Sequence, residues 1–293
     1  MRIGKFAAGL WAACLSIGCG DDASGSGALT VQVSAEASIS EGLSVGQDEE
    51  NSRDYAVTFS KYLVAVGRVT LGRSGQADRR DERVFVADLL RVGEQGAQLF
   101  GLNDLASGRW EKLSFETPIT PAGATPVAGV TPADLQVMID KQLTYWIEGT
   151  VQRADKPVRF VFQVGAPARF AECQTDARPG VAVPDDGRTA VSLTLHGDHL
   201  FFNQFLTGDE GTITRQAKWI ADADVDGDGL VVTEDLSKPL PELATERLFP
   251  SAAGYQLREG PYGPITNALD FVRAQLATQG HVNGEGECVW EPL

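Results

Sequence analysis

The sequence carries little positive charge, and its 25 lysine and arginine residues form no basic cluster beyond the pair Arg79-Arg80. Aspartate and glutamate together number 40, so the formal net charge is −15 at pH 7. An acidic chain without a basic patch repels a phosphate backbone. Nucleic acid is therefore excluded as an expected partner, whereas cations are favoured.

Other signals that would identify a function are also missing. The sequence contains neither a P-loop nor a dinucleotide-binding glycine fingerprint, and it shows no internal repeat. Cysteine and histidine are scarce, with four and three residues, and no cysteine is left over as a nucleophile once each has been assigned below. A binding protein is therefore expected more than an enzyme.

Residues 1–18 have the pattern of a secretory signal peptide, with Arg2 and Lys5 before an apolar run that is too short to span a membrane. The run ends in Leu15-Ser16-Ile17-Gly18-Cys19, which resembles the lipobox of bacterial lipoprotein precursors. That resemblance implies that Cys19 carries lipid, that residues 19–27 form a tether, and that the protein faces the periplasm or the cell surface. Gly20, and not Asp, follows the cysteine, which favours the outer membrane.

The remaining cysteines predict a disulfide. Cys14 leaves with the signal peptide and Cys19 takes the lipid, so Cys173 and Cys288 are the two that stay in the mature chain. In an oxidising compartment these two residues most simply pair with each other. Two free buried thiols are the alternative.

The segment 28–200 predicts a mainly β domain, a β-sandwich of immunoglobulin-like type, because short apolar alternations recur between turn residues. The predicted strands are 29–33, 55–59, 62–66, 69–71, 84–86, 108–115, 144–151, 158–162 and 191–195. A short helix is predicted to begin at Pro132, which suits the first helical position.

After residue 200 the apolar period becomes helical. Residues 201–293 are therefore predicted to be a helical C-terminal segment that packs on the sandwich. The predicted helices lie at about 213–220, 241–248 and 265–276, the last of them ending before Gly280.

The run from Asp224 to Asp235 has the spacing of an EF-hand calcium loop. Oxygen donors stand at positions 1, 3, 5 and 12, the position-7 residue offers a backbone carbonyl, and Gly229 at position 6 allows the sharp turn. The predicted Ca²⁺ ligands are Asp224, Asp226, Asp228, Leu230 and Asp235. The loop resembles the EF-hand-like loops of bacterial extracellular proteins and stands alone, which favours a structural clamp over a switch. A solvated acidic loop is the alternative.

The three histidines predict a second metal site. His196 and His199 follow the last strong strand, and His281 follows the last predicted helix, in a loop that the Cys288 disulfide would hold. Three imidazoles on rigid neighbours are ligands for Cu²⁺ or Zn²⁺. Asp198 is either a fourth ligand or an acceptor that orients a histidine. Histidines that only fix loops, or that act as a catalytic base, are the alternatives.

An exported chain, strands that lead to histidines and a Trp146-bearing strand resemble, in architecture, the periplasmic copper-binding β-sandwich proteins associated with methanobactin uptake. In that family a modified tryptophan joins histidines at copper, a role that no tryptophan of this chain can be assigned from its sequence. Two rival functions stay open. One is a surface interaction or adhesion module with purely structural metals, and the other is a zinc-dependent hydrolase with Asp198 or Glu285 as base.

Overall fold

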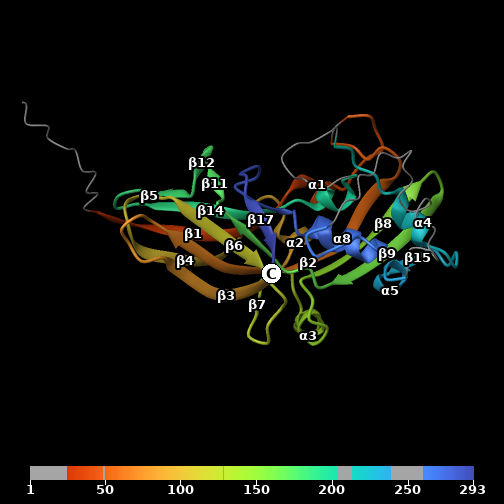
Figure 1. The fold of residues 1–293 in the computed structure, drawn as a ribbon, viewed down its shortest axis with the longest axis horizontal. Helices are drawn as coiled ribbons and strands as arrows, with labels where there is room; N and C mark the ends of the chain where they lie inside the picture. Colours follow the sequence, from red (N-terminus) through yellow and green to blue (C-terminus); the bar gives the residue numbers. More distant parts are fainter. Residues whose placement is uncertain (1–24, 49, 128, 204–212, 239–259) are drawn as a thin grey trace, which may run out of the picture.

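The computed structural model describes residues 25–48, 50–127, 129–203, 213–238 and 260–293. Strands dominate these residues and form several sheets, as the ribbon in Figure 1 shows. The prediction of a mainly β protein is therefore confirmed. The predicted signal peptide, Cys19, most of the predicted tether and the predicted helix at 241–248 lie outside the described residues.

The larger sheet contains nine strands in the described part of the chain. Its main strand order is β15 (Leu230–Val232), β9 (Lys156–Val164), β8 (Tyr145–Arg153), β2 (Ala56–Gly72), β6 (Lys112–Thr117), β10 (Ala168–Ala171) and β17 (Val289–Pro292). β3 (Arg79–Asp88) pairs with β2 and with β7 (Thr125–Pro126). The predicted hairpin of 144–151 with 158–162 is confirmed as β8 and β9, which pair antiparallel.

β2 joins what the sequence analysis treated as three separate strands. Gly67 and Arg68 have the turn composition that predicted a break, but here they form a bulge, with the register to β3 shifting between Gly67 and Val69. Arg68 takes a left-handed φ of 48° at that point. A bulge bends a strand without ending it, so turn residues do not always mark a strand end.

The smaller sheet positions the candidate site. Its order is β16 (Gly280–Val282), β14 (Arg188–Leu195), β1 (Ser26–Ala35) and β4 (Ala97–Ala106). β14 runs parallel to β1, with Leu195 opposite Ala35, and antiparallel to β16. Glu36 and His196, which follow the last pair of β1 and β14, therefore leave the sheet at the same end. Two short sheets join β11 (Gln174–Thr175) to β12 (Arg178–Pro179) and β13 (Val181–Val183) to β5 (Gly108–Trp110).

The two larger sheets share one apolar core. Alternate residues of β1, Leu29, Val31 and Val33, are fully buried and belong to the same cluster as Phe160 and Phe162 of β9. Such burial contributes roughly 1.5–3 kcal/mol per large side chain, which makes this cluster the main source of stability. The core therefore spans the molecule.

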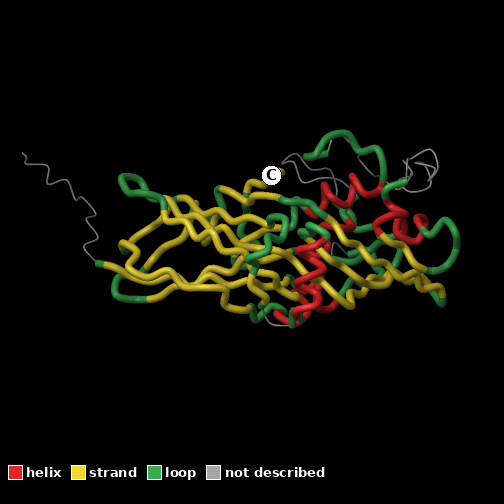
Figure 2. The backbone as a smooth tube through the Cα atoms, turned by 90° about the horizontal axis from the view of Figure 1, so that it is seen from below, coloured by secondary structure: helices red, strands yellow, loops and turns green. Residues whose placement is uncertain are grey.

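Helices are short and lie mainly in the half of the molecule that holds the C-terminal elements (Figure 2). They are α1 (Ala37–Glu41), α2 (Leu89–Val92), α3 (Pro132–Asp140), the 3₁₀ helix η1 (Gly197–Phe201), α4 (Lys218–Ala223), α5 (Thr233–Leu236) and α8 (Ala268–Leu276). The helix predicted at Pro132 is present, capped by the Thr131 hydroxyl. None of the described helices has the length and apolar character needed to cross a bilayer.

The C-terminal part also supplies strands that the sequence analysis missed. Among residues 213–238 and 260–293, β15 adds to the larger sheet beside β9, β16 pairs with β14, and β17 pairs with β10. These strands have three or four residues each, too few for an alternating pattern to register. The described residues after 213 thus contribute strands to both larger sheets.

The predicted disulfide between Cys173 and Cys288 is present, with an Sγ–Sγ distance of 2.10 Å. It joins the segment after β10 to the segment before β17, and Cys173 is fully buried in the core. Because the two cysteines are 115 residues apart, the bond closes a large loop.

Replacing both cysteines, as Cys173→Ser with Cys288→Ser, is expected to lower the free energy of unfolding by roughly 4–5 kcal/mol, the loop-closure entropy restored to the unfolded chain. Urea unfolding of oxidised protein and of the double variant measures the difference. A difference below about 1 kcal/mol would contradict this entropic role.

Candidate metal centre

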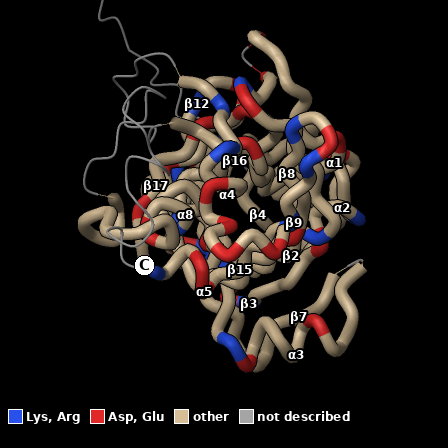
Figure 3. The backbone as a smooth tube through the Cα atoms, turned by 90° about the vertical axis from the view of Figure 1, so that its right-hand side faces the viewer, with Lys and Arg blue, Asp and Glu red and all other residues tan. Residues whose placement is uncertain are grey.

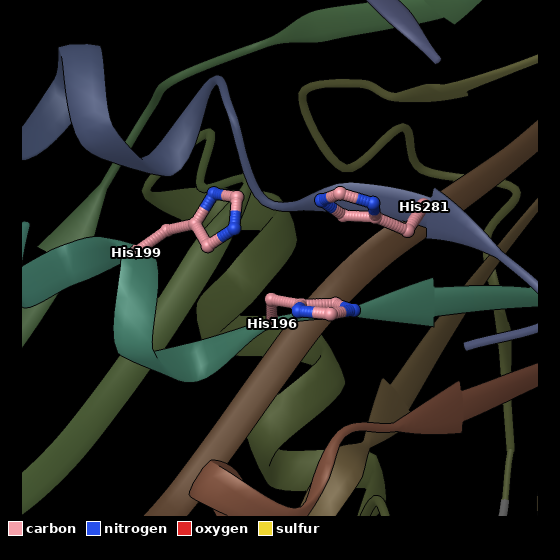
Figure 4. Close-up of side chains that lie close together, drawn as sticks. All are labelled: His196, His199 and His281. Carbon is pink, nitrogen blue, oxygen red and sulfur yellow. The ribbon is translucent and has the colours of Figure 1, made fainter. Parts of the chain in front are cut away.

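The end of β14 brings two of the histidines together. β16 pairs with β14 so that His281 stands opposite Thr194, and His196 is the second residue after that position. His199 follows one turn later in η1, which packs against α8. The three rings therefore come from a strand end, a short helix and a neighbouring strand, as Figure 4 shows.

The three imidazoles are close enough to share one ion. The ring centroids are 4.1 Å apart for His196 and His281, 5.4 Å for His196 and His199, and 5.3 Å for His199 and His281. One nitrogen from each ring lies within 4.8 Å of the others. Metal–nitrogen bonds of about 2.0–2.1 Å place tetrahedral ligands roughly 3.3 Å apart, so small ring rotations would close the site.

Hydrogen bonds determine which nitrogen of His196 and of His199 carries the proton. His196 Nε2 lies 3.0 Å from the Gly284 carbonyl oxygen, which can only accept, so Nε2 donates. His199 Nδ1 lies 2.9 Å from the Thr278 hydroxyl, whose own proton is donated to the Gln275 carbonyl. His199 Nδ1 therefore donates as well. In the neutral form of each ring the other nitrogen then keeps its lone pair, and this is the atom that can bind a metal.

His281 is the third ring of the group, and one of its nitrogens lacks a hydrogen bond from the described residues. Its Nδ1 is buried and has no hydrogen-bond partner among the described residues. Burial, reinforced by the neighbouring His196 and His199, lowers the pKa of His281 to about 2. Burial likewise holds the pKa of His199 well below its ordinary value. Both rings are neutral at pH 7, as metal ligation requires.

Asp198 is close to His196 but belongs to a different group of candidate ligands. It is 4% exposed, and its Oδ2 accepts hydrogen bonds from Arg215, one of them from Nε at 2.8 Å. The structure groups Asp198 with Glu36 and His196, with ligand atoms within 4.8 Å of one another, and not with His199 and His281. Glu36, Arg215, Thr278 and Gly284 had no motif in the sequence that could have revealed them.

The acidic loop follows α4 at the right-hand end of the molecule in Figure 1, an end that Figure 3 shows to be rich in acidic residues. Carboxylate oxygens of Asp224, Asp226 and Asp228 lie within 4.8 Å of one another. Gly229 takes a left-handed φ of 79°, and its amide donates to Asp224 Oδ2 at 3.1 Å. Asp224 Oδ1 is buried and has no hydrogen-bond partner among the described residues.

The end of the loop is tied to the larger sheet. Leu230 and Val231 begin β15, which pairs parallel with β9, and Val231 is fully buried. Asp235 stands apart from the three grouped aspartates. Its Oδ2 accepts from the Val232 amide at 2.9 Å, and its Oδ1 accepts from Lys238 at 3.1 Å. The structure thus brings together the first three predicted Ca²⁺ ligands and turns the position-12 carboxylate towards its own helix.

Comparison of the chain with protein-family models, with curated proteins and with solved structures finds no match.

The depressed pKa values of His199 and His281 make the metal-free protein acid-sensitive. Well above pH 6.5, the ordinary pKa of histidine, both histidines are neutral in the folded and unfolded chains. As the pH falls through this value, the histidines of the unfolded chain bind protons, whereas those of the folded chain stay neutral. The free energy of unfolding should then fall by about 1.4 kcal/mol per histidine for each pH unit.

Urea unfolding in the presence of a chelator, between pH 7.5 and pH 5, measures this slope above the range in which most carboxylates titrate. His281→Gln should remove close to half of it. A slope equal in wild type and variant would contradict the burial of a neutral His281.

Proposed function

We propose that this chain is an exported, lipid-anchored metal-binding protein that holds Cu²⁺ or Zn²⁺ at His196, His199 and His281 and a structural Ca²⁺ ion in the loop 224–235. The observation that carries the proposal is the convergence of three imidazoles, with the lone pairs of His196 and His199 left unshared. Three nitrogen ligands suit both Cu²⁺ and Zn²⁺.

Burial makes binding more favourable than a purely structural role for these histidines. A buried polar atom without a partner destabilises the fold, and the Nδ1 atom of His281 has no hydrogen-bond partner among the described residues. An ion shared by the three rings would give the His281 ring a polar partner. The Gly284 carbonyl and the Thr278 hydroxyl are the outer partners that metal-binding histidines usually have.

The proposed location rests on the lipobox-like sequence 15–19, which implies attachment to a bacterial membrane through Cys19. The Cys173–Cys288 disulfide supports an oxidising compartment, the periplasm or the cell surface. We also propose an immunoglobulin-like sandwich, which the shared core of the two larger sheets supports.

The proposed Ca²⁺ ion would rest on Asp224, Asp226 and Asp228, with the Leu230 carbonyl as a further ligand. Asp224 Oδ1 is buried and accepts no hydrogen bond from any described residue, which supports a cation at this place. Asp235 would join the ion only by leaving Lys238. Because Val231 ties the loop to β9, the ion would clamp α4 and α5 to the larger sheet.

Tag-free protein is expected to bind one Cu²⁺ or Zn²⁺ ion per chain in isothermal titration calorimetry. Changing His199 to Ala removes one of three ligands and should weaken the affinity for the metal by more than about 100-fold. This loss is larger than the one expected when a residue that only hydrogen-bonds to a ligand is removed. Affinity that survives the triple change of His196, His199 and His281 to Ala would contradict the site.

Thr278 provides a matched pair of variants for the same titration. Thr278→Val removes the hydroxyl that accepts from His199 Nδ1, so the proton of His199 is no longer held on Nδ1. The affinity for the metal should then fall roughly 10-fold to 100-fold. Thr278→Ser keeps the hydroxyl and should stay within about twofold of wild type. Equal affinities in the two variants would show that the hydrogen bond does not prepare His199 for metal.

Calcium is expected to raise the melting temperature relative to a chelator, because an ion at about 100 times its Kd adds about 2.7 kcal/mol to stability. Asp224→Asn with Asp228→Asn should abolish the difference. Asp222→Asn is the control, since Asp222 pairs with Lys218 on α4 and lies outside the loop. A calcium effect of equal size in all three proteins would refute the loop as its origin.

A further inference from the structure

A polar pocket with a volume of about 480 Å³ opens beside His196, between α1, η1, residues 42–44 and 50–51, and Glu285. Its lining includes the carboxylates of Glu36, Glu41, Glu50, Asp198 and Glu285, against the single guanidinium of Arg215. Carboxylates crowded around one concave surface concentrate cations there. Of the three histidines, His196 is the one that lines this pocket.

Glu36, His196 and Asp198 form a compact group within the pocket, with ligand atoms no more than 4.8 Å apart. The parallel pairing of β1 with β14 explains why Glu36 and His196 are neighbours, since each is the first residue after its strand. The amide of Glu36 also donates to the Leu195 carbonyl at 3.0 Å. One nitrogen and two carboxylate oxygens suit a borderline divalent cation such as Zn²⁺ or Cu²⁺.

Asp198 provides an independent indication that the group takes a ligand. The residue is 4% exposed, and Arg215 occupies its Oδ2 through Nε and Nη2. Its Oδ1 is also buried, but no described residue forms a hydrogen bond to it. The ion pair with Arg215 thus holds the carboxylate in place and leaves one oxygen free for a cation.

His196 belongs both to this group and to the group with His199 and His281. Its Nε2 proton is committed to the Gly284 carbonyl, which leaves one lone pair on the ring. That lone pair can bind only one ion at a time. The two groups are therefore alternative positions for a single ion, one in the pocket and one among the three histidines.

We propose that Glu36, His196 and Asp198 form an outer cation site at which a divalent Zn²⁺- or Cu²⁺-type ion binds before it passes to the inner site of His196, His199 and His281. This inference rests on the proposed function of the inner site. His196 stays bound throughout and exchanges its oxygen partners for the other two imidazoles. An ion at the outer site carries its remaining water ligands into the pocket and sheds them on transfer.

The test measures rates as well as affinity, with Co²⁺ as an optical stand-in for Zn²⁺ and tag-free protein in stopped flow. Glu36→Gln removes a charged ligand, yet the new side-chain amide oxygen can still accept from the Ser38 amide and so cap α1. Glu41→Gln is the matched control, because it removes the same charge from the same pocket outside the three-residue group. Glu36→Asp, which keeps a carboxylate, is the rescue variant.

Glu36→Gln should slow both Co²⁺ loading and chelator-driven release by about tenfold, with the equilibrium Kd within about twofold of wild type. Glu41→Gln should slow loading by about twofold at most, and Glu36→Asp should load faster than Glu36→Gln. The outer site is overturned if Glu36→Gln loads as fast as Glu41→Gln, or if it weakens the equilibrium Kd as a permanent ligand would. A wild-type Co²⁺ spectrum identical to that of the triple histidine-to-alanine variant overturns the inner site as well.

Discussion

The candidate metal centre depends on one structural relation, the position of β14 between β1 and β16. Because β14 is parallel to β1, Glu36 and His196 leave the sheet at the same end. Because β16 is antiparallel to β14, His281 returns to that end from the other side. A shift of one residue in either pairing would turn these side chains to opposite faces. The sheet register therefore determines the geometry of the site.

The second constraint is the removal of the histidines from water. Burial keeps His199 and His281 neutral, and neutral imidazole is the form that binds metal. The protons of His196 and His199 are directed outward, to the Gly284 carbonyl and the Thr278 hydroxyl. Arg215 forms an ion pair with Asp198 and holds its carboxylate beside His196. The surroundings thus prepare nitrogen lone pairs, together with one carboxylate oxygen to which no described residue donates a hydrogen bond.

Much of this arrangement could be predicted from local patterns. The alternation in 191–195 indicated the strand that leads to His196, and the aspartate spacing from Asp224 indicated the loop in which three carboxylates converge. The nearness of Glu36 could not be predicted, because it depends on a parallel pairing between strands that are distant in sequence. β16 could not be predicted for a similar reason. Its three residues are too few to show an alternating pattern, and they form a strand because they pair with β14.

Anomalous X-ray scattering from crystals of tag-free protein grown with Zn²⁺ or Cu²⁺ tests the central claim most directly. At the absorption edge of the metal, the account predicts one strong peak within about 2.0–2.1 Å of a nitrogen of each of His196, His199 and His281. A second, weaker peak beside Glu36 at partial occupancy would agree with the outer site. Well-ordered rings of His196, His199 and His281 with no peak between them, in crystals that hold the metal elsewhere, would contradict it.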